Sequence, residues 1–82
     1  MGFKISRRIE TEREIHYYIS NEDDEKIRVT DRVFVSGIKV IYNKLTKQYT
    51  IMAPILDFKN INRTLHTEIE KFIEEEIKGE MK

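Results

Sequence analysis

The chain has 82 residues, of which 39% are hydrophobic and 37% are charged, a size that fits one small domain over residues 1–82. Its 15 basic and 15 acidic side chains balance, so the net charge neither favours nor excludes a polyanionic partner. The absence of cysteine excludes disulfides, thiolate nucleophiles and cysteine-ligated zinc. We expect a cytoplasmic protein with no membrane association, because no apolar run is long enough to span a bilayer and no signal peptide is visible.

Alternating apolar residues predict β-strands in the first part of the chain. Residues 3–9 read as a strand with Arg7 and Arg8 outward, and we expect this strand to lie at a sheet edge. Alternation resumes over residues 15–19, where Ile15, Tyr17 and Ile19 share one face. Residues 21–25 are rich in Asn and Asp and predict a hairpin loop.

The next segment, residues 27–42, predicts a long β-rich stretch. Its alternation changes parity at Gly37, which indicates a bulge or bend there. A turn is expected over residues 43–47, followed by a strand over residues 48–53 that Pro54 ends. The short apolar run of residues 55–58 predicts an edge strand.

The last part of the chain predicts an amphipathic helix over residues 63–78. Its apolar positions follow the 3.6-residue period: Leu65, Ile69, Phe72, Ile73 and Ile77. Asn62 is the expected N-cap, and Gly79 is expected to end the helix in the left-handed conformation. The sequence therefore predicts an α+β fold, an antiparallel twisted sheet of four to five strands with one C-terminal amphipathic helix on one face.

The neutral total charge hides a basic segment between two acidic ones. Residues 36–65 hold a single acid and five bases: Lys39, Lys44, Lys47, Lys59 and Arg63. If these five share a face or rim of the sheet, they form a patch that a phosphate backbone could follow. Tyr42 and Tyr49 flank the central turn and could stack on unpaired bases. A nucleic-acid-binding regulator is the first hypothesis.

The acidic segments support a second hypothesis, a module or inhibitor that binds a protein partner. The candidate residues are Glu22, Asp23, Asp24, Glu25, Glu74 and Glu75. Such a cluster could occupy a basic nucleic-acid-binding surface as a polyanion does, which is how small inhibitors encoded by mobile elements work. The structural alternative for both charged sets is an ordinary solvated surface.

Catalysis and cofactor binding are not expected. The only histidines, His16 and His66, lack cysteines or carboxylates at ligand spacing, so we expect no metal site. No serine lies in a nucleophile motif, and three glycines are too few for a phosphate-binding loop. We therefore expect neither a catalytic centre nor a cofactor.

One family resemblance rests on the order of several segments. The first segment is the run from Phe34 to Ile41, which is followed by a turn and by a strand that ends in Met52-Ala53-Pro54. The Ile61-Asn62 step then leads into the helix. Together with the spacing of Leu65, Glu68, Ile69, Phe72 and Ile73, this order resembles the stage V sporulation protein G (SpoVG) family. The resemblance covers about residues 33–73.

The resemblance implies a single SpoVG-like domain, a homodimer, and binding to DNA or RNA as a regulator. In that family a basic loop follows the Met-Pro step and is tied to nucleic-acid binding. Here Pro54 is followed by Ile55, Leu56 and Asp57, so that loop has no counterpart.

Overall fold

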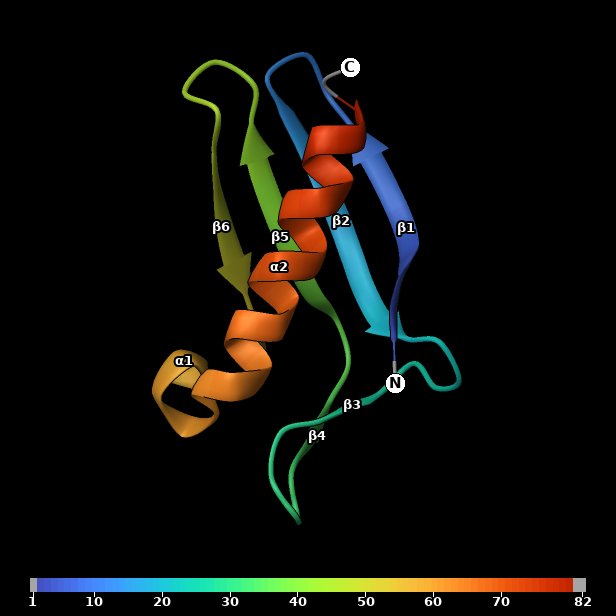
Figure 1. Ribbon diagram of the computed structural model, residues 1–82, viewed down its shortest axis with the longest axis vertical. Helices are drawn as coiled ribbons and strands as arrows, with labels where there is room; N and C mark the ends of the chain where they lie inside the picture. Colours follow the sequence, from blue (N-terminus) through green and yellow to red (C-terminus); the bar gives the residue numbers. More distant parts are fainter. Residues whose placement is uncertain (1, 81–82) are drawn as a thin grey trace.

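The computed structural model describes residues 2–80 as a four-stranded antiparallel sheet with one long helix across it (Figure 1). The main sheet has the strand order β1-β2-β5-β6, and a separate two-stranded sheet pairs β3 with β4. The elements are β1 (Phe3–Glu10), β2 (Glu14–Asn21), β3 (Ile27–Arg28), β4 (Phe34–Val35), β5 (Ile38–Asn43), β6 (Gln48–Met52), α1 (Phe58–Ile61) and α2 (Arg63–Glu80). The predicted α+β class, antiparallel sheet and C-terminal helix are confirmed.

The core lies between α2 and one face of the sheet. The buried residues of α2 are Leu65, Ile69, Ile73 and Ile77, which recur every four residues as the predicted stripe requires. They pack against alternate residues of the two central strands: Ile15, Tyr17 and Ile19 of β2 and Ile38, Val40 and Tyr42 of β5. Burying these side chains is the main stabilising contribution, at about 1.5–3 kcal/mol for each large aliphatic residue.

The start of α2 follows the prediction, and its end does not. The backbone N–H of Leu65 donates to Asn62 Oδ1 over 3.0 Å, so Asn62 caps the helix as predicted. Gly79 was expected to end the helix, but α2 continues to Glu80, and Gly79 does not take a positive φ. The reason is tertiary: the Glu80 carboxylate accepts hydrogen bonds from Arg8 and Tyr17 of the sheet, which hold the last turn in place.

A bulge in β1 changes which side chains face the helix. The register with β2 shifts between Ile5 and Arg7, so Ile5 faces α2 before the bulge and Arg8 faces it afterwards. Arg7 and Ile9 consequently point to the other side of the sheet. The prediction that Arg7 and Arg8 both point outward is wrong for Arg8, whose Nε lies 2.6 Å from Glu80 Oε1.

The segment over residues 27–42, predicted as a long β-rich stretch with a bulge or bend at Gly37, contains three separate strands. β3 and β4 form a small hairpin whose turn is held by Thr30 Oγ1, which accepts from the N–H of Val33 over 3.1 Å. The chain then bends at Gly37, with φ 78°, where the sequence predicted a bulge or bend, and enters the main sheet as β5. Residues 21–25, predicted as a hairpin loop, instead link β2 to the small sheet.

The predicted edge strand over residues 55–58 is also wrong. Asp57 adopts the left-handed conformation with φ 60°, and the chain enters the short helix α1. The buried ring of Phe58 packs against His66, with 5.8 Å between ring centroids. Burial of Phe58 under the start of α2 therefore overrides the strand propensity of the segment, and β6 is left as an edge of the sheet.

Replacing Ile69 with Asp tests the helix register. Ile69 is fully buried, so the carboxylate would enter the core without a partner, and we expect the free energy of unfolding to fall by about 3–5 kcal/mol. Urea denaturation followed by circular dichroism measures this loss. Thr67→Asp, at an exposed position of the same helix, is the control, and equal midpoints for the two variants would contradict the packing described.

Candidate nucleic-acid interface

The sheet face opposite α2 is open. In Figure 1 α2 crosses one face of the four strands, and no helix among residues 2–80 covers the other. The side chains of this open face alternate along each strand with the buried ones. They are Lys4, Arg7, Ile9, Glu14, His16, Tyr18, Ser20, Lys39, Ile41, Asn43, Gln48, Thr50 and Met52, of which Ser20 is buried.

Tyr18 lies near the centre of the open face between two cations. The strand register puts Arg7 of β1 and Lys39 of β5 directly beside it. The guanidinium carbon of Arg7 lies 6.0 Å from the centroid of the Tyr18 ring, and the Nζ of Lys39 lies 5.8 Å from it. Both distances are within the range of cation–π attraction. The two cations therefore hold the ring in position on the sheet.

Three side chains of the open face carry a positive charge and lie in a part of the sheet without acidic partners among residues 2–80. Lys4, Arg7 and Lys39 make no ion pair with any carboxylate in residues 2–80. The nearby Glu14 interacts with His16 instead, with 3.1 Å between Oε1 and Nε2. The three cations are thus available to an anionic ligand.

A row of side chains that includes two isoleucines lies next to Tyr18 and its cations. Ile9, His16, Ile41 and Thr50 are direct neighbours across the four strands, and Met52 lies beside Lys39 on the edge strand. Ile9 and Ile41 are half-buried, whereas Met52 is 47% exposed. The open face therefore combines an aromatic ring, apolar surface and cations that have no ion-pair partner in the described part of the chain.

The five basic residues predicted as one patch lie in three places. Lys39 is on the open face beside Tyr18. Lys44 and Lys47 lie in the β5–β6 turn, and Lys59 and Arg63 lie in α1 and at the start of α2, at the opposite end of the molecule (Figure 1). The expectation that the five share one face or rim is wrong, because β5 and β6 carry the turn and α1 to opposite ends of the sheet.

Lys44 is also engaged within the protein. Its ammonium donates to the Glu10 carboxylate and, over 2.8 Å, to the carbonyl oxygen of Thr11. Together with Arg8, it holds the pKa of Glu10 below its ordinary value. Lys44 therefore serves an ion-pair network at the end of the sheet: Lys44–Glu10–Arg8–Glu80.

The acidic candidates also fall into two separate groups. Glu22, Asp23, Asp24 and Glu25 are exposed in the loop between β2 and β3, whereas Glu74 and Glu75 belong to α2. Glu74 accepts a hydrogen bond from the hydroxyl of Tyr49 over 3.1 Å. No element brings the loop and the helix glutamates together into one surface.

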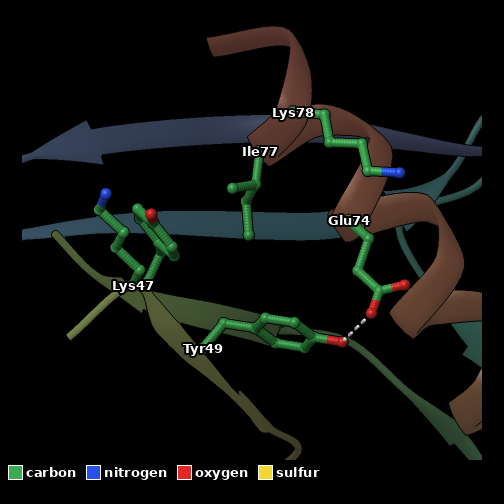
Figure 2. Close-up of a pocket in the computed structure, with 6 residues that line it drawn as sticks. Lys47, Tyr49, Glu74, Ile77 and Lys78 are labelled. Atoms are coloured by element: carbon green, nitrogen blue, oxygen red, sulfur yellow. Dashed lines mark hydrogen bonds between the residues drawn. The ribbon is translucent and has the colours of Figure 1, made fainter. Parts of the chain in front are cut away.

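A groove lies on the helix side of the sheet, between the end of α2 and the β5–β6 hairpin (Figure 2). Its volume is about 330 Å³, and it is lined by Tyr42, Lys47, Tyr49, Glu74, Ile77 and Lys78. Figure 2 shows Ile77 pointing from α2 toward the sheet, with the Tyr49–Glu74 hydrogen bond across the groove. Burial, reinforced by Glu74, raises the pKa of Tyr49 to about 12. We assign this groove a structural role at the helix–hairpin junction.

Sequence reasoning missed Arg7 and Tyr18 as site residues. A signal was present for Tyr18, because residues 16 and 18 must lie on the face opposite Ile15 and Tyr17. Nothing in the sequence placed Arg7 beside Tyr18. Their juxtaposition depends on the bulge in β1 and on the order of the strands.

Comparison with protein-family models, curated proteins and solved structures gives no match to this chain. The SpoVG relationship therefore stays a prediction. Within residues 2–80, no three His, Asp or Glu side chains are grouped so that they could hold a metal ion. None of the helices in that range combines the length and apolar character needed to cross a membrane.

The raised pKa values of the Tyr17 and Tyr49 phenols predict a loss of stability at alkaline pH. Burial, reinforced by Glu80, raises the pKa of Tyr17 well above its ordinary value, as Glu74 and burial do for Tyr49. An unfolded chain ionises these phenols near pH 10, whereas the folded chain keeps them protonated. Their stabilising contribution is complete below pH 10 and is lost as the pH rises toward 12.

Urea midpoints measured between about pH 9 and 12 test this expectation. For Tyr17→Phe the midpoint should fall less steeply than for the wild type, because the variant has lost one group that resists ionisation. Lysine deprotonation affects both proteins equally, so it does not contribute to the difference between their slopes. Equal slopes for the two proteins would contradict the assignment.

Proposed function

We propose that this protein binds single-stranded nucleic acid, RNA or DNA, on the open face of its sheet and acts as a non-enzymatic regulator. One observation carries the proposal: Tyr18 stands between Arg7 and Lys39 on a face that no helix covers, and neither cation has a carboxylate partner in residues 2–80. An aromatic ring surrounded by free cations is the arrangement with which proteins bind unpaired bases and their phosphates.

The chemistry of the face favours a single strand. A base that stacks on Tyr18 takes the place of Arg7 or Lys39 against the ring. It must also expose its flat surface, which a duplex keeps inside its own stack. Arg7 and Lys39 would then pair with the flanking phosphates, and Lys4 extends the positive charge along the face. Ile9, Ile41 and Met52 offer apolar contacts to neighbouring bases and sugars.

The distribution of acidic residues also favours binding of the nucleic acid on the open face over binding on the helix side. Six glutamates lie on α2, on the other side of the sheet, against three basic residues of that helix. A polyanion approaching from the helix side meets this negative charge, whereas one approaching the open face meets Lys4, Arg7 and Lys39. The charge of the protein thus favours one face for a nucleic acid.

The alternative, an acidic module for a basic protein partner, has weaker support. Its candidate residues are divided between the β2–β3 loop and α2, and Glu74 is hydrogen-bonded to Tyr49. The SpoVG resemblance implies the same class of ligand as the open face. Regulation and a cytoplasmic location come from sequence reasoning and stay predictions.

Tyr18→Ala should weaken binding to single-stranded oligonucleotides by about 5- to 150-fold, the effect of losing one stacking contact of about 1–3 kcal/mol. Fluorescence anisotropy with labelled RNA, single-stranded DNA and duplex DNA of equal length measures the loss. Lys59→Gln, an exposed position in α1 away from the open face, is the control and should bind as the wild type does. Equal affinities for Tyr18→Ala and the wild type, or stronger binding to the duplex, would contradict the proposal.

The salt dependence tests the cations separately. With three phosphates neutralised by Lys4, Arg7 and Lys39, a fourfold rise in salt should lower the affinity for a single strand about 20-fold. The double variant Arg7→Gln/Lys39→Gln should show a clearly shallower slope, whereas Lys47→Gln should keep the wild-type slope. A slope unchanged in the double variant would show that these cations do not contact phosphates.

A further inference from the structure

The cations of the open face lie toward one end of its strands. Arg7 and Lys39 are level with Tyr18, and Lys4 lies further toward the same end of the sheet. The opposite end of the face carries a carboxylate, that of Glu14. A polyanion bound at Tyr18 is therefore attracted toward the cationic end and repelled from the other.

The β3–β4 hairpin lies just beyond this cationic end. Only residues 36 and 37 separate β4 from β5, so the hairpin continues directly from the end of the main sheet (Figure 1). Phe34 of β4 precedes Lys39 of β5 by five positions, and their Cα atoms are therefore at most about 17 Å apart. A chain of nucleotides that passes Lys39 can reach the hairpin.

Phe34 points away from the core. Its neighbour Val35 pairs with Ile27, and both of these residues are buried, whereas Phe34 pairs with Arg28 on the other face of the hairpin. Lys39 likewise follows a buried residue of β5 and lies on the open face. Phe34 and Lys39 thus both project away from the core that α2 covers.

Phe34 is an exposed aromatic residue with positive charge beside it. It is 55% exposed, although phenylalanine is usually buried, and Arg32 in the adjoining turn makes no ion pair with a carboxylate in residues 2–80. Arg28 pairs with Asp31, but their side chains are 60% and 95% exposed, so water and salt screen this pair. The hairpin therefore repeats, outside the main sheet, the combination of ring and cations found at Tyr18.

We propose that Phe34 is a second stacking site for the single strand, which runs from Tyr18 across the cationic end of the sheet to the β3–β4 hairpin. This inference rests on the proposed function, because it extends the same binding path. Aromatic side chains in series along a basic path are how proteins hold several unpaired nucleotides at once. The ligand is then a strand of several nucleotides that contacts both rings, with Arg32 beside a phosphate near Phe34.

Substitutions of Phe34 separate stacking from a merely apolar contact. Phe34→Leu removes the ring but keeps an apolar side chain, and it should weaken binding to a single strand of about 12 nucleotides by at least about 5-fold. Phe34→Trp keeps an aromatic surface and should bind at least as tightly as the wild type. Fluorescence anisotropy measures the affinities. Because Phe34 is exposed, urea midpoints close to that of the wild type should show that both variants fold.

The matched control is Leu45→Ala, which removes an apolar side chain that is 75% exposed in the β5–β6 turn, at the other end of the sheet. It should bind as the wild type does. Arg32→Gln tests the charge of the hairpin separately. It should make the log–log salt dependence of binding to the same strand shallower by about 0.7, the effect of one lost phosphate contact on a single strand.

The outcomes separate this inference from the proposed function. If Tyr18→Ala weakens binding while Phe34→Leu binds as the wild type does, the open face binds nucleic acid, the second stacking site is wrong, and Phe34 is left exposed for a protein partner. If Phe34→Trp binds as weakly as Phe34→Leu, the ring is not a stacking surface and the inference fails. If neither Tyr18→Ala nor Phe34→Leu changes the affinity, the proposed function fails and this extension fails with it.

Discussion

The packing of one apolar helix stripe on one face of the sheet decides the rest of this structure. A sheet has two faces, and α2 supplies enough apolar surface for only one of them. Because Ile69 and Ile73 bury the inner side of β2 and β5, the alternating residues of the same strands must face outward. The position of Tyr18 on the open face is thus a direct consequence of the position of Tyr17 in the core.

The bulge in β1 determines which side chains of this edge strand face α2 and which belong to the open face. Without it, one unbroken alternation would place Arg7 and Ile5 on the helix side and Arg8 on the open side. With it, Arg8 reaches Glu80 at the end of α2, while Arg7 reaches the ring of Tyr18. One extra residue therefore joins β1 to the end of α2 by an ion pair and places on the open face a cation that has no carboxylate partner in residues 2–80.

Charge follows the same two-sided arrangement. The acids of the helix side are partly engaged: Glu80 accepts from Tyr17 and Arg8, and Glu74 accepts from Tyr49. These contacts join α2 to both halves of the sheet and raise the pKa of the two phenols. The cations of the open face have no such partners in the described residues, so the neutral chain presents two surfaces of opposite character.

The sequence by itself determined the features that depend on local spacing. The apolar period of α2, the cap at Asn62, the bend at Gly37 and the opposite orientation of His16 and Tyr17 all follow from side-chain periodicity and backbone preference, which act over a few residues. The sequence also placed Lys39 among the candidate cations of the site.

Only the tertiary structure decided which of these elements meet. The continuation of α2 through Gly79, the α1 turn at residues 58–61 and the separation of β3 and β4 from the main sheet each depend on contacts between distant segments. The same holds for the meeting of Arg7, Tyr18 and Lys39, which come from three strands. Strand order and register are set by burial of the whole core, and the free energy of that burial is not contained in any short stretch of the chain.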